Sequence, residues 1–238
     1  MKNPWALVFL LVGIGKLGAI DPPLDALLTA YSDQVFSGTL KSNQVLEGLT
    51  EVKTQILATS ASDQQEALVQ AFLIAGQFFI DIENKSQAES LFLQAEKYAL
   101  EISKNPIPRN LALLVEVRTK FLRIKDVGFI ISQAGAILEE AEKILQKEPN
   151  NLRALFVVAY GRLYSPSFFG GNPQRSKDLF EKILNLEISN KTVRFQAFLG
   201  LSEAWRKLGN PNSRQKALDQ ATKIYPLNLE LKKVRVQN

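Results

Sequence analysis

The chain has 238 residues, of which 46% are hydrophobic and 22% are charged, a composition typical of a globular protein rather than of a disordered tail or a fibre. It contains no histidine and no cysteine, which excludes imidazole acid–base catalysis, thiolate nucleophiles, disulfides and the usual nitrogen and sulfur ligands of zinc and copper. The net charge of +5 is small and the basic residues are mostly interleaved with acidic ones, so we expect no nucleic-acid partner. The sequence has no complete phosphate-binding loop and no glycine-rich dinucleotide-binding motif, and we expect no cofactor.

Residues 1–19 are expected to form a secretory signal peptide. Lys2 supplies the positive charge, residues 5–14 form a short apolar core, and Ala19 ends a stretch suited to cleavage. The apolar run is shorter than the roughly 20 residues that span a bilayer. An uncleaved N-terminal anchor is the alternative, and it would be the protein's one link to a membrane. The sequence therefore predicts an exported, periplasmic or extracellular protein whose domain covers residues 20–238.

Beyond Pro22 the sequence predicts one helix after another and no strand alternation. Asn172 followed by Pro173 is typical of a helix start, and Gly209 marks a helix end. The expected helices span residues 24–36, 42–59, 63–83, 86–103, 109–125, 128–147, 151–164, 173–187, 191–208 and 212–225. The predicted fold class is all-α.

Two segments far apart in the chain repeat one spacing of large and small residues, in steps of four, three, nine, four and three. The first consists of Phe72, Gly76, Phe79, Ala88, Phe92 and Ala95, and the second of Phe198, Ser202, Trp205, Arg214, Leu218 and Ala221. Large residues four and seven apart share a helical face, and a small residue between them admits a neighbouring helix. Weaker copies of the second half of the spacing raise the count to about five helical hairpins, which must stack to bury their apolar faces.

Residues 69–102 and 195–228 resemble tetratricopeptide (TPR) repeats, although Arg214 stands where a small residue is expected. The resemblance implies a right-handed α-solenoid of about five TPR-like hairpins, with an irregular helical bundle as the alternative. Its implied function is binding of a protein or peptide through the concave face. The chain also resembles, distantly, the periplasmic T components of TRAP-type transporters. That likeness implies an alternative, a carrier whose helices enclose an apolar cavity for a small ligand.

The most distinctive loop is expected at residues 165–173, where Phe168 and Phe169 lie among glycine, proline and serine. Two adjacent phenylalanines in a loop need an apolar environment. They either dock a partner or fold back onto their own hairpin, beside Ala159 and Gly161.

Helices that come first in each pair line the concave surface of a helical-repeat stack, which makes their polar residues candidates to face a groove. Arginine suits the grip of a partner's carboxylate. The candidate partner-binding residues are Arg118, Arg153, Tyr160, Arg162, Phe168 and Phe169, with Gln77 and Asp81 as further groove candidates.

The absence of catalytic chemistry predicts a scaffold that is not an enzyme and has no catalytic or metal-binding residues. A hydrolase of the cell envelope that uses carboxylates alone is a further alternative. Its acids would include Glu139 and Glu142, three residues apart on one helix, although such acids usually form the polar side of an amphipathic helix.

Overall fold

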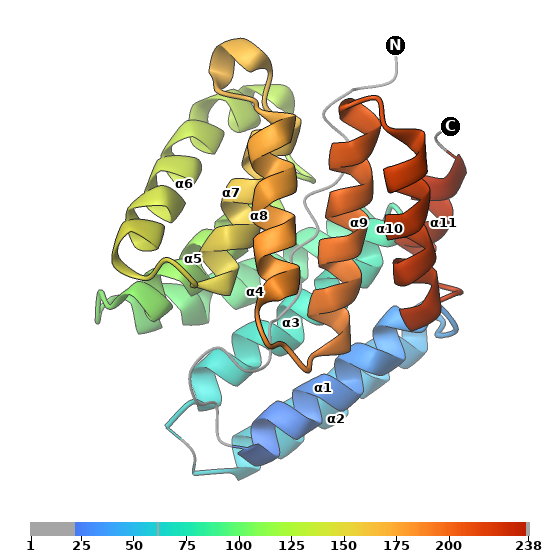
Figure 1. The fold of residues 1–238 in the computed structure, drawn as a ribbon. Helices are drawn as coiled ribbons and strands as arrows, with labels where there is room; N and C mark the ends of the chain where they lie inside the picture. The colour runs from blue at the N-terminus through green and yellow to red at the C-terminus, as the bar shows by residue number, and fades with distance from the viewer. Residues whose placement is uncertain (1–21, 61, 237–238) are drawn as a thin grey trace.

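The computed structural model describes residues 22–60 and 62–236, and within them the chain forms eleven α-helices, one short 3₁₀ helix and no strand (Figure 1). The expected signal peptide, residues 1–19, lies outside the described residues. The helices are α1 (Pro22–Phe36), α2 (Ser42–Ala58), α3 (Gln64–Asp81), α4 (Lys85–Ser103), α5 (Pro108–Phe121), α6 (Val127–Lys147), α7 (Leu152–Tyr164), η2 (Ser167–Phe169), α8 (Pro173–Asn185), α9 (Lys191–Lys207), α10 (Pro211–Ile224) and α11 (Leu229–Val236).

The ten expected helices are all present, and the largest difference in their ends is at α5, expected to reach residue 125 and ending at Phe121. Capping hydrogen bonds and backbone conformations at the helix ends explain why the predicted and observed ends agree. The Asn172 side chain accepts a hydrogen bond from the Arg175 backbone N–H at 2.9 Å, with Pro173 in the first helical position. Gly209 has a φ of 70°, a conformation that favours glycine, and it follows α9.

Small residues lie under large ones where helices pair, as the spacing predicts. Gly76 and Ala95 are buried, and a Cβ atom on Gly76 would lie 2.3 Å from the Phe92 ring. Gly200 has the same relation to Phe180, at 2.2 Å. Side chains at these two positions would hold the paired helices apart, so the glycines set the distance between α3 and α4 and between α8 and α9.

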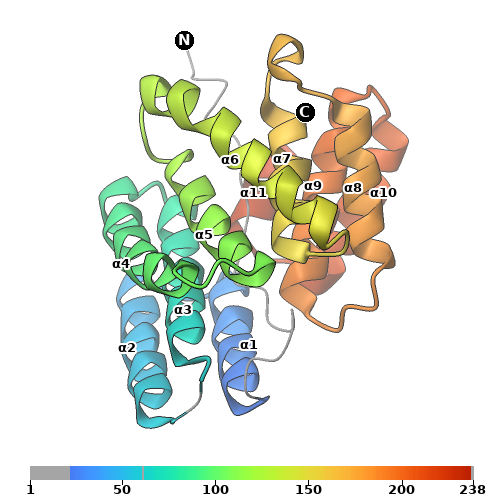
Figure 2. The ribbon, with the colours of Figure 1, turned by 90° about the vertical axis from the view of Figure 1, so that its left-hand side faces the viewer.

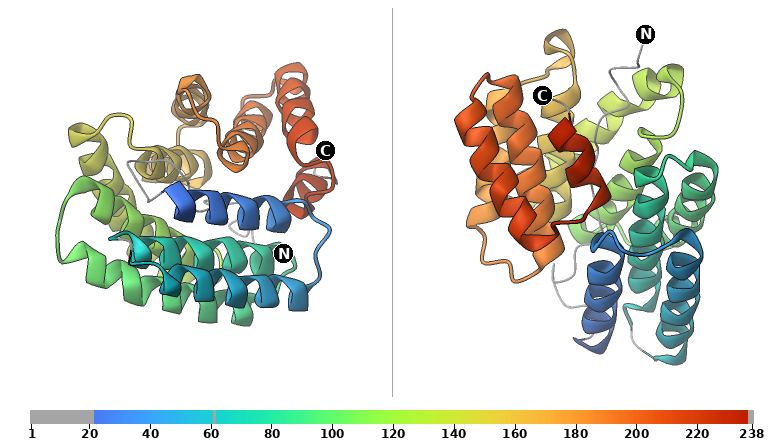
Figure 3. Two further views of the ribbon diagram at one scale, coloured as in Figure 1. Left: turned by 90° about the horizontal axis from the view of Figure 1, so that it is seen from below. Right: turned by 90° about the vertical axis from the view of Figure 1, so that its right-hand side faces the viewer.

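Each described helix packs against the next one in the chain, and several odd-numbered helices also contact one another. The pairs α1–α3, α5–α7 and α7–α9 are in contact, and α1 also meets α9. Figure 3 shows α1 between the layer that contains α3 and the helices α8 and α9. Ser32 and Thr192 hydrogen-bond at 3.0 Å across this junction, and the Phe36 and Phe195 rings pack edge to face with centroids 6.2 Å apart. The stack therefore curls until its first described helix reaches its ninth.

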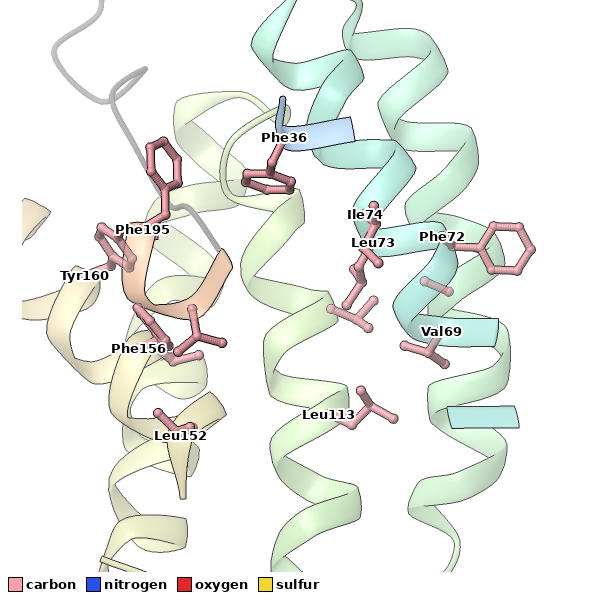
Figure 4. Packing of buried hydrophobic residues seen from close by; sticks show 14 of the residues in the cluster. Phe36, Val69, Phe72, Leu73, Ile74, Leu113, Leu152, Phe156, Tyr160 and Phe195 are labelled. Atoms are coloured by element: carbon pink, nitrogen blue, oxygen red, sulfur yellow. The ribbon is translucent and has the colours of Figure 1, made fainter. Parts of the chain in front are cut away.

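The inner faces of the odd-numbered helices form one continuous apolar core. Figure 4 shows its members from α3, α5, α7 and α9, among them Leu73, Leu113, Phe156 and Phe195. The T-shaped contact between Tyr160 and Phe180, with centroids 4.9 Å apart, extends the core to α8. None of the helices in residues 22–60 and 62–236 is long and apolar enough to cross a membrane.

Candidate functional site

Arg153 does not face a groove. Its side chain is buried, with Nε donating to Glu116 Oε2 at 2.9 Å and Nη2 donating to Glu66 Oε1 at 3.1 Å. Arg109 adds a second ion pair to Glu66, at 2.6 Å. These residues come from α3, α5 and α7, whose inner faces meet in the core. The expectation of a partner-binding guanidinium is corrected: Arg153 holds three helices together.

Tyr160, Gln77 and Asp81 are also buried rather than exposed on a concave surface. The Tyr160 hydroxyl donates to the Gln196 backbone carbonyl at 3.2 Å. Gln77 donates to Asp81 at 2.7 Å and accepts from Lys120 at 3.2 Å. The curl of the stack brings the inner helices against one another, so polar residues expected to line a groove instead bond across the interior.

Burial shifts the pKa values of this interior cluster. It raises the pKa of Glu116, an effect opposed by Arg153 and Lys120. It also raises the pKa of Asp81, together with the nearby Glu230 carboxylate of α11. Both carboxyl groups are therefore costly to ionise. The charges around Glu116 and Asp81 thus affect the stability of the fold, and these two residues do not form a solvent-facing site.

Lys120 is expected to make the free energy of unfolding depend on pH. Burial lowers its pKa to about 7, with Arg123 acting in the same direction and Glu116, Asp81 and Glu230 opposing the shift. Between that pH and the ordinary lysine pKa near 10.4, the unfolded chain binds a proton that the folded chain does not. The contribution of Lys120 to the free energy of unfolding therefore rises with pH in this window, by at most about 1.4 kcal/mol per pH unit.

In a Lys120→Met variant, the free energy of unfolding should no longer show this rise between about pH 7 and 10. Urea unfolding of both proteins at several pH values between about 7 and 10 measures the difference in slope. Equal slopes for the two proteins would contradict the assignment.

The two remaining arginine candidates lie nearer the surface. Arg118 is partly exposed, with Nη1 3.7 Å from Glu140. Arg162 donates from Nη2 to Glu142 at 2.6 Å and from Nη1 to the Gly170 carbonyl at 2.7 Å. Arg162 therefore supports the loop between α7 and α8.

This loop is held in a defined conformation. The Asn172 N–H donates to the Arg162 carbonyl at 2.7 Å, and Gly170 has a φ of 82°, which closes the turn after η2. The tip carries Phe168 and Phe169, which are 79% and 59% exposed, with ring centroids 4.6 Å apart.

The fold-back interpretation of the phenylalanines is wrong. The space above Gly161 belongs to Leu138 of α6, whose Cδ1 lies 2.9 Å from where a Gly161 Cβ would be. Because that position is occupied, both rings stay at the surface.

The first half of α6 lies beside this loop, at the same end of the molecule (Figure 2). Val127 and Ile131 are 41% and 65% exposed, and Gly135, one turn further on, has open space where a Cβ would be. A cleft of about 220 Å³ separates helix and loop; its lining includes Ile130, Ile131, Gly135, Leu138, Pro166 and Phe169. We call the surface made by Val127, Ile131, Gly135, Phe168 and Phe169 the α6–loop face.

The α6 part of this face was not identified from the sequence. A signal for it was present, since residues 127–138 carry no charge and have apolar residues on more than one side of the helix. Phe129, Ile130 and Leu138 pack against the core, which leaves Val127 and Ile131 facing outward.

The acids considered for a hydrolase do not have the surroundings of a general acid. Glu139 is hydrogen-bonded to Lys143 (2.6 Å), which lowers its pKa, whereas a general acid needs a raised one. Glu142 pairs with Arg162 and Arg175. In the part of the chain that the structure describes, histidine, cysteine, aspartate and glutamate form no cluster suited to a metal ion.

The α6–loop face is thus an uncharged, largely apolar surface with a cleft. Comparison of the chain with protein-family models, curated proteins and solved structures found no match.

Proposed function

We propose that this protein is a non-catalytic, exported scaffold, a right-handed α-solenoid of about five TPR-like hairpins that binds a protein or peptide partner. The observation that carries the proposal is the α6–loop face, where Ile131, Phe168 and Phe169 are all more than half exposed. Large apolar side chains gathered on one exposed surface typically mark an interaction site.

The energetics favour a partner at this face. Burying a phenylalanine or isoleucine side chain contributes about 1.5–3 kcal/mol. Arg162 and Asn172 already fix the loop through hydrogen bonds to Gly170 and to the Arg162 carbonyl, so little ordering is needed when a partner arrives.

The proposed binding surface is therefore not the concave face but the end of the molecule where α6 begins and the loop between α7 and α8 projects (Figure 2). Phe168 and Phe169 lie on it and Arg162 supports it, whereas Arg153 and Tyr160 belong to the interior. Arg118 pairs with Glu140 of α6.

A photo-crosslinking amino acid at position 168 should capture one defined protein in the native cell. The same group at Leu93, an exposed apolar residue of α4, serves as the matched control and should not capture it. Phe169→Ser should lower the yield at position 168 by about tenfold, as expected for loss of a central apolar anchor. Equal capture from both positions, or none at position 168, would refute the proposal.

A further inference from the structure

We propose that the α6–loop face pairs two copies of this chain, each inserting Phe168 into the cleft beside Gly135 of the other. The inference rests on the proposed function, because it names the partner that occupies the same face.

The face carries both a protruding ring and a cleft able to receive one. Phe168 is the most exposed aromatic side chain among the described residues. The cleft measures about 220 Å³ and opens above Gly135, where nothing lies within 4 Å of a Cβ position. An apolar cavity of about 150 Å³ is large enough to hold benzene, so the volume of this cleft is sufficient for a phenyl ring.

A protrusion and a cleft on the same face allow that face to pair with itself in a two-fold symmetric dimer. In such a dimer the same surface meets itself, so a residue that enters the partner's cleft is matched by its symmetry mate entering in return. Phe168 packs beside Phe169, with ring centroids 4.6 Å apart, and Phe169 lines the cleft together with Gly135 of α6. The protruding ring and the cleft are therefore both next to Phe169, so one self-pairing face can contain both.

The charge of this face does not oppose a second copy. The chain has more basic than acidic residues, 29 against 24, so two copies repel least where they meet through uncharged surfaces. Residues 127–138 and 163–174, which form this face, contain no charged side chain.

The cations at the rim do not select an acidic peptide or an anionic lipid. Arg162 and Arg175 both pair with Glu142, at 2.6 and 3.0 Å, and Lys125 pairs with Glu89. A lipid-binding or acid-binding face would leave several cations without acidic partners.

The absence of cysteine allows the contact to be tested directly by cross-linking. Phe168→Cys and Gly135→Cys proteins, mixed and oxidised, should form more disulfide-linked dimer than either variant alone, because the bond requires close approach of the two positions. No excess of the mixed dimer would contradict the Phe168–Gly135 contact.

Sedimentation velocity provides the second measurement. The wild-type chain should sediment as a dimer, and Phe168→Ser and Gly135→Leu should each weaken the dimer by at least about tenfold. Gly135→Leu fills the cleft without meeting another atom at Cβ, and circular dichroism checks that both variants fold. Leu93→Ser, on α4, is the matched control and should leave the dimer intact.

Three outcomes would overturn the inference. A wild-type monomer at about 100 μM that still captures another protein from position 168 would reject the second copy and keep the proposed function. If the protein floats with phosphatidylcholine–phosphatidylglycerol vesicles in a Phe168-dependent way, and neither dimerises nor captures a protein, both the dimer and the proposed function would be rejected. A dimer unaffected by Phe168→Ser and Gly135→Leu would place the interface elsewhere.

Discussion

Replacing Arg153 by methionine is expected to lower the free energy of unfolding by about 3–5 kcal/mol, the usual effect of removing one partner from a buried ion pair. The substitution leaves Glu116 fully buried without its 2.9 Å bond to the guanidinium. Glu66 suffers less, since Arg109 still pairs with it at 2.6 Å. Urea unfolding followed by circular dichroism measures the change.

Arg118→Met is the matched control for this experiment. Arg118 is partly exposed and lies 3.7 Å from Glu140, so its loss should change the free energy of unfolding by no more than about 1 kcal/mol. Adding Glu116→Gln to Arg153→Met should recover part of the lost stability, because a neutral amide is less costly to bury. Similar effects of Arg153→Met and Arg118→Met would contradict the interior role of Arg153.

Gly200→Ala is expected to lower the free energy of unfolding by about 1–3 kcal/mol, through overpacking. The added methyl group would lie 2.2 Å from Cζ of Phe180. That ring has no room to retreat, because it is completely buried and packs against Tyr160 at 4.9 Å between centroids. Either the ring or the whole of α8 must move.

Gly135→Ala makes the same chemical change where there is space, since nothing lies within 4 Å of its Cβ position. Alanine favours a helix over glycine by about 0.5–1 kcal/mol, so this variant should be more stable than the wild type. Thermal unfolding at one low protein concentration compares the two variants. Equal losses would mean that the contact with Phe180, specific to Gly200, is not the cause.

The helices could be predicted because the signals for them are local. Asn172 with Pro173, and Gly209, start or end helices through contacts within a few residues. The C-terminal helix α11 was missed because its support is distant in sequence. The Asn228 side chain caps α11 by accepting a hydrogen bond from the Glu230 N–H. It also donates to the carbonyl of Phe36 at 3.0 Å, and Phe36 is far from Asn228 in the sequence.

The candidate site was predictable only in part, for the same reason. Composition drew attention to Phe168 and Phe169, but their exposure depends on Leu138 occupying the space above Gly161. Arg153 was misplaced because Glu66 and Glu116, its partners, lie 87 and 37 residues away in sequence. The sequence pattern of α7 alone does not show that Arg153 will pair with two buried carboxylates from other helices.

The meeting of α1 with α9 alters how the protein should come apart. In an open array of helix pairs, the outermost units touch one neighbour each and fray first. Here the Thr192 hydroxyl is hydrogen-bonded to the hydroxyls of both Ser32 and Tyr225, at 3.0 Å each. Three hydroxyl groups therefore connect α1 with α9 and with the residue that follows α10. Removal of α1 would therefore take contacts away from α9, and the helices should unfold together rather than one pair at a time.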